Sequence, residues 1–134
     1  MNKNQHPVAN ENTPPQARDL AATRPGVILM WGVPIAAILS TNFGLWAPQP
    51  TLFIIAGALI WMGIGCLFNA RRCGRVHCRF TGPWFLLAGL VPLMVGFGIL
   101  DLSTGQWNIF SAVTTFGALG IWYFSEKILG TYRG

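Results

Sequence analysis

Two cysteines and a histidine lie within one strongly basic stretch of the chain, and a third cysteine precedes it. The stretch reads Arg71-Arg72-Cys73-Gly74-Arg75-Val76-His77-Cys78-Arg79. Positive neighbours favour thiolate over thiol, and thiolate sulfur together with imidazole nitrogen suits Cu(I), Hg(II) or Zn(II). The candidate metal ligands are therefore Cys66, Cys73, His77 and Cys78.

The spacing of these four residues limits which of them can share an ion. On one continuous helix Cys73 and His77 are one turn apart and could bind the same ion, whereas Cys66 lies about 10 Å from Cys73 along the axis. Cys78 would point roughly 140° away from Cys73 on such a helix. If Gly74 ends the helix, a turned loop allows a site made of Cys73, His77 and Cys78. Both arrangements remain open at this point.

A purely structural interpretation of the same residues is also available. Cys66 would then be a small buried apolar residue, and Cys73, His77 and Cys78 would be loop residues without a ligand. An odd number of thiols in a reducing compartment argues against a disulfide framework. The arginines of the stretch are candidates for contact with anionic lipid headgroups or with another anion, and they are Arg71, Arg72, Arg75 and Arg79.

The segments around this stretch are apolar enough for a membrane. The chain is 52% hydrophobic and only 10% charged, and a bilayer core of about 30 Å needs roughly 20 helical residues. Backbone amides in lipid must be satisfied within the segment, so these runs predict helices. We expect an all-α, integral membrane four-helix bundle over residues 27–130, preceded by a disordered polar cytoplasmic tail at 1–26. The predicted spans are 27–46, 51–69, 83–101 and 108–125, with a basic Cys/His loop at 70–82.

The distribution of positive charge predicts the orientation. With four spans, all nine lysines and arginines fall on one side, in the two tails and in the loop at 70–82. Because basic residues near helix ends stay on the cytoplasmic side, both termini should be cytoplasmic. We expect a multi-pass protein of the inner (plasma) membrane.

Several other functions have little support. We expect no enzyme, because the chain has no nucleophile elbow, no paired carboxylates and no glycine-rich phosphate loop. Nucleic acid is not an expected partner, since membrane orientation already explains the basic charge. The expected partners are anionic lipid headgroups, a further membrane protein or a second copy of the chain.

The segment from Cys66 to Pro83 resembles a loop found in an uncharacterised family of small four-helix membrane proteins of bacteria and archaea. The resemblance covers the loop and the adjoining helix ends, and it implies no activity. The chain is also loosely similar to small mercuric-ion transporters, which combine few membrane helices with cysteines near the cytoplasmic side. Those transporters carry adjacent Cys-Cys pairs within a span, and this chain has none.

Two functions follow from the sequence as expectations. The first is binding or movement of a soft metal ion through thiols at the cytoplasmic side. The second is a non-catalytic accessory or assembly subunit of a larger membrane complex, whose arginine-rich loop contacts lipid or a partner.

The predicted orientation can be tested by mapping the accessibility of short tags in intact cells. Tags at residues 71–79 and at both termini should be protected from reagents outside the cell, because every basic residue is expected on the cytoplasmic side. Labelling of a tag at 71–79 from outside would contradict the orientation.

Overall fold

The computed structural model describes residues 19–43 and 45–130 and is built from helices in those ranges. A single 3-10 turn, η2 (Leu20–Ala22), comes before the first helix. The first helix has three parts: α1 (Arg24–Val27), a π-helical segment η3 (Ile28–Gly32) and α2 (Val33–Thr41). Three long helices follow, namely α3 (Pro48–Cys73), α4 (Val76–Gly96) and α5 (Thr104–Leu129).

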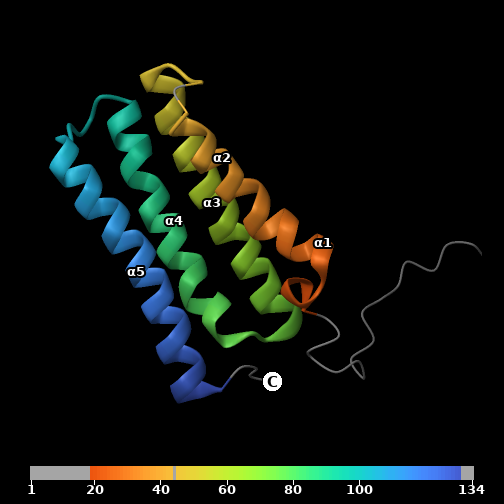
Figure 1. Cartoon of the computed structure of the whole chain (residues 1–134). Coiled ribbons are helices and arrows are strands. Elements are labelled where there is room, and N and C mark those ends of the chain that lie inside the picture. Colours follow the sequence, from red (N-terminus) through yellow and green to blue (C-terminus); the bar gives the residue numbers. More distant parts are fainter. Residues whose placement is uncertain (1–18, 44, 131–134) are drawn as a thin grey trace, which may run out of the picture.

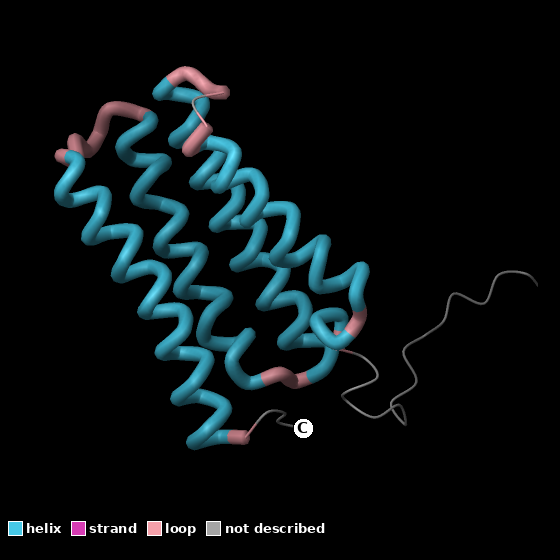
Figure 2. Tube along the Cα trace, viewed as in Figure 1, coloured by secondary structure: helices cyan, strands magenta, loops and turns pink. Residues whose placement is uncertain are grey.

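The helices run up and down, and each packs mainly on the next one along the chain (Figure 1). Figure 2 shows the turns gathered at the two ends of the bundle. The α3–α4 turn, η2 and the end of α5 lie at one end, here called the basic end. Among the described residues, the basic side chains of these segments and of the adjoining helix ends are Arg24, Arg71, Arg72, Arg75, Arg79 and Lys127. The all-helical class and the four helices agree with the prediction.

Three of the four helices are long and apolar enough to cross a membrane, by length and composition. They are Arg24–Thr41, Pro48–Cys73 and Val76–Gly96. The fourth predicted span lies in α5, which is not among them. The outside of the bundle is rich in exposed apolar side chains, and residues such as Phe116 and Ile128 of α5 are more than two-thirds exposed. Membrane insertion and the location of the termini stay predictions.

The loop predicted at 70–82 is much shorter in the structure. Helix α3 continues to Cys73, and Gly74 ends it with a left-handed backbone, φ 70°. Helix α4 then begins at Val76 rather than at Pro83, which lies inside it. The first two turns of α4 bury Val76 and Thr81, so packing keeps this segment helical despite the proline signal.

The tail predicted to be unstructured at 1–26 is partly ordered. Residues 1–18 lie outside the described part of the chain. Residues 19–26 form η2 and the start of α1, where the side chain of Thr23 accepts a hydrogen bond from the backbone of Gly26. The side chain of Asp19 is fully buried, and its partners are described below.

Helices α3 and α4 lie close together where Gly63 of α3 and Gly82 of α4 face each other. A Cβ atom on Gly63 would lie 2.8 Å from the Leu86 side chain and 2.9 Å from the carbonyl oxygen of Gly82. A Cβ atom on Gly82 would lie 2.6 Å from the Leu67 side chain. Small residues are therefore required at this contact, which lies about two to three helical turns from the α3–α4 turn.

Replacing Gly63 by alanine should lower the free energy of unfolding by about 1–3 kcal/mol, because the new methyl group overlaps backbone that must shift. The measurement is reversible unfolding of the purified chain in detergent. Gly57→Ala is the matched control, since no atom lies within 4 Å of a Cβ placed there. Equal stability of the two variants would contradict the close approach.

Candidate functional site

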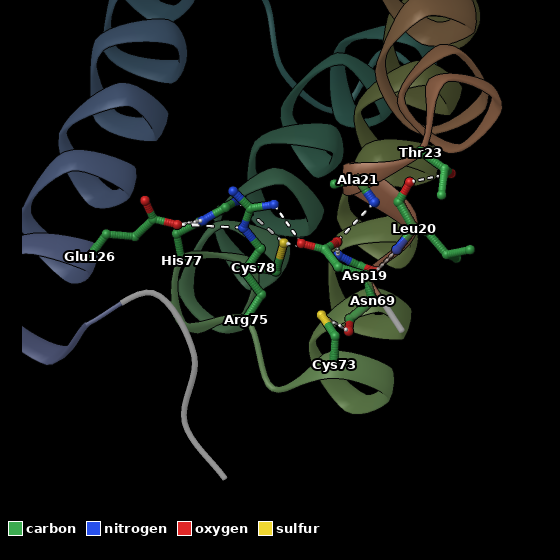
Figure 3. Close-up of polar contacts among 10 residues, drawn as sticks. All are labelled: Asp19, Leu20, Ala21, Thr23, Asn69, Cys73, Arg75, His77, Cys78 and Glu126. Carbon is green, nitrogen blue, oxygen red and sulfur yellow. Dashed lines mark hydrogen bonds and ion pairs between the residues drawn. The ribbon is translucent and has the colours of Figure 1, made fainter. Parts of the chain in front are cut away.

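A buried polar cluster occupies the basic end, and Arg75 lies at its centre (Figure 3). Nη1 of Arg75 donates to Oδ2 of Asp19 at 2.6 Å, and Nε donates to Oε1 of Glu126 at 3.5 Å. Arg75 belongs to the α3–α4 turn, Asp19 precedes η2 and Glu126 lies near the end of α5. One guanidinium therefore connects three segments that are far apart in the sequence.

The carboxylate of Asp19 has further partners in this cluster. Its Oδ1 accepts from Nδ2 of Asn69 at 2.7 Å and from the backbone N–H of Ala21 at 2.8 Å. Oδ1 of Asn69 accepts in turn from the backbone N–H of Leu20 at 2.9 Å. These bonds hold η2 against α3, which explains why this part of the predicted tail is ordered.

Burial and pairing act in opposite directions on the pKa of Asp19. Burial raises the pKa, but the hydrogen bond from Asn69, the positive charge of Arg75 and the backbone N–H of Ala21 outweigh it and lower the pKa below its usual value. The carboxylate is therefore ionised at neutral pH, as the ion pair with Arg75 requires.

His77 links this ion-pair network to a thiol. Its Nδ1 lies 2.6 Å from Oε1 of Glu126, and its Nε2 lies 3.4 Å from Sγ of Cys78. The imidazole is thus held between a carboxylate and a sulfur, with its ring orientation fixed by Glu126. His77 and Cys78 are adjacent in the first turn of α4.

The thiol of Cys78 meets a second thiol from the neighbouring helix. Cys78 on α4 and Cys66 on α3 lie close enough for their thiols to interact, and Thr81 lies beside Cys66. Nδ2 of Asn69 lies 3.9 Å from the Cys78 sulfur. Cys66 and Cys78 are both almost completely buried. The cysteines that come together are therefore a pair that the spacing analysis did not single out.

Of the other predicted site residues, His77 contacts this thiol pair, and Cys73 has a hydrogen-bond partner of its own. The thiol of Cys73 donates to the backbone oxygen of Asn69 on its own helix, at 3.0 Å. Because Gly74 ends α3, Cys73 and His77 are not neighbours on one helix as the first arrangement required. Arg75, predicted to contact lipid, is instead paired with two carboxylates. The three remaining arginines of the stretch are exposed, and they are Arg71, Arg72 and Arg79.

Within the described ranges, no group of three or more His, Cys, Asp or Glu side chains is arranged to hold a metal ion. The four-ligand site that structural zinc needs is thus not formed by these residues. A pair of thiols can still hold an ion that accepts two sulfur ligands.

A cavity of about 320 Å³ lies between the first helix, α4 and α5 at the level of this cluster. His77 and Arg75 form part of its wall, together with the indole rings of Trp31 and Trp122. Neither Cys66 nor Cys78 is among the residues that line it. His77 therefore contacts both this cavity and the thiol of Cys78.

Neither carboxylate of the cluster was among the residues predicted from the sequence. The chain has only four acidic residues against nine basic ones. Two of those acids, Asp19 and Glu126, fall in segments predicted to lie on the same side as the basic stretch. Their charge was the feature that could have pointed to them. A buried arginine needs a carboxylate partner, and these two acids are expected on the same side of the bundle as the basic stretch.

Comparison of the chain with protein-family profiles, with curated protein sequences and with solved structures finds no match. The function of the site is therefore inferred from the positions and contacts of its residues.

Asp19→Asn should lower the free energy of unfolding by about 2 kcal/mol at neutral pH, since a charge-assisted hydrogen bond to Arg75 is lost. The pKa of Asp19 is lower in the folded chain than in the unfolded chain. The ion pair therefore contributes its full stabilisation above about pH 4, and this contribution is lost as the pH falls through the pKa of the folded chain. The difference between wild type and variant should therefore shrink below pH 4 in unfolding experiments.

Asp101→Asn provides the control, because Asp101 is exposed in the turn before α5. Its effect on stability should be small throughout this pH range. A difference between wild type and Asp19→Asn that stays constant down to acidic pH would contradict the ion pair.

Proposed function

We propose that the chain is a multi-pass protein of the inner membrane, with four membrane helices and both termini in the cytoplasm. Three helices long and apolar enough to cross a bilayer support this proposal, as do the exposed apolar side chains on the outside of the bundle. The basic residues gathered at one end support the orientation.

We further propose that this protein binds a soft metal ion, Cu(I) or Hg(II), between the sulfurs of Cys66 and Cys78. The observation that carries the proposal is the proximity of these two thiols, which come from different helices and are both buried. Cu(I) and Hg(II) prefer sulfur and accept two thiolates in a nearly linear arrangement. Such an ion replaces the thiol protons and bridges α3 and α4.

The surrounding groups suit this chemistry. His77 lies beside Cys78 and on the wall of the cavity, so it can take part in delivering the ion. Glu126 holds the imidazole from its other side, as carboxylates that orient metal-binding histidines do. Zn(II) fits less well, because it usually takes four ligands.

Metal binding can be measured on the chain purified in detergent and loaded with Cu(I) or Hg(II) under reducing conditions. Wild type should retain about one ion per chain, and Cys66→Ser and Cys78→Ser should each abolish that binding, since a single thiolate cannot replace the pair. Cys73→Ser is the matched control and should retain the ion, because its thiol bonds to the backbone of α3.

Loss of binding in Cys73→Ser with retention in Cys66→Ser would contradict the proposed pair. Wild type that binds neither ion, and that co-purifies with a larger membrane protein, would instead support the accessory-subunit function. Recovery of the chain from the aqueous fraction without detergent would overturn membrane insertion itself.

A further inference from the structure

The face of α3 turned away from α4 carries an apolar stripe that ends in a positive charge. Trp61, Ile64 and Phe68 follow one another at three- and four-residue intervals, and each is more than half exposed. Arg71 lies one turn beyond Phe68 on the same side of the helix. From Trp61 to Arg71 the stripe is about 15 Å long, at 1.5 Å per residue.

This stripe is hollowed along its length. A cavity of about 390 Å³ lies between α3 and the start of the first helix, where Trp61, Ile64 and Phe68 line it together with Leu29. A second hollow of about 220 Å³ is also lined by Ile64 and Phe68, and it reaches Arg71. Ile64 and Phe68 border both hollows, and the two neighbouring hollows together are here called the α3 groove.

The wall of the α3 groove is fixed by a break in the first helix. Residues 28–32 are π-helical, with the N–H of Val33 bonded to the carbonyl of Ile28 five residues earlier. Pro34 has no N–H for the next carbonyl, that of Leu29. The indole of Trp61 donates to this carbonyl at 3.0 Å. The bond holds the first helix against α3 and sets the indole ring as one side of the groove.

The positive charge at the end of the groove is available to a ligand. Arg71 is exposed, and among the described residues it forms none of the ion pairs of the basic end. Arg75, four residues later, already has two carboxylate partners. An apolar channel that ends in an exposed guanidinium matches an acyl chain joined to a phosphate, since the fork of arginine fits phosphate oxygens.

We infer that the α3 groove binds an anionic phospholipid, with one acyl chain against Trp61, Ile64 and Phe68 and with the phosphate headgroup at Arg71. The headgroup then lies at the basic end, which is the level expected for the cytoplasmic leaflet. This inference rests on the proposed membrane insertion and is independent of metal binding.

The test is native mass spectrometry of the full chain in mild detergent, titrated with phosphatidylglycerol or with phosphatidylcholine carrying the same acyl chains. Wild type should bind phosphatidylglycerol more tightly. Arg71→Gln should weaken that binding about fivefold, because one arginine near an anionic headgroup contributes an attraction of that size. It should weaken phosphatidylcholine binding less, because the choline group offsets the charge of the phosphate. Arg79→Gln is the matched control: it removes an equally exposed arginine of the basic end that does not line the groove.

Three results would overturn the lipid site. The first is equal affinity of wild type for the two lipids. The second is an equal loss of phosphatidylglycerol affinity in Arg71→Gln and Arg79→Gln, which would indicate general attraction to the basic end. The third is displacement of the phospholipid by a simple fatty acid at the same concentration. None of them bears on the thiol pair. Recovery of the chain from the aqueous fraction would contradict membrane insertion, whereas the three results above would contradict only the lipid site. The two failures are therefore distinguishable.

Discussion

The arrangement of the basic end depends on the charge of Arg75. A guanidinium that is mostly removed from water is costly unless carboxylates pair with it, and Asp19 and Glu126 supply them from the two extremities of the described chain. Through these pairs one side chain fixes η2, the α3–α4 turn and the end of α5 relative to one another. His77 shares the carboxylate of Glu126, so the orientation of its ring depends on the same network.

The thiol pair follows from the turn that Arg75 occupies. Gly74 takes a left-handed backbone that ends α3, and α4 starts again two residues later. Cys78 is thereby placed on the face of α4 that packs on α3, opposite Cys66, and glycines at the α3–α4 contact allow the two helices to lie close together. The site thus joins a helix end, a tight helix pair and an ion-pair network.

The sequence predicted the helices far better than the site. Long uncharged runs indicate membrane-type helices whatever their neighbours, so the all-helical class and four helices could be foreseen. The pairing of Cys66 with Cys78 could not, because it depends on whether the helix ends at Gly74 and on how far α4 extends before Pro83. Burial of Val76 and Thr81 is what keeps the residues before Pro83 helical, so that α4 begins at Val76. Asp19 was missed because a polar, proline-containing tail gives no periodic signal, and only its distant partners order it.

The most direct test of this account is to identify which two cysteines form a disulfide. The chain is oxidised in membranes with diamide, and the linked cysteines are then mapped by peptide mass spectrometry. Two neighbouring sulfurs should be linked first, so the account predicts a bond between Cys66 and Cys78, with Cys73 left as a free thiol. A bond between Cys73 and Cys78, with Cys66 still reduced, would contradict it.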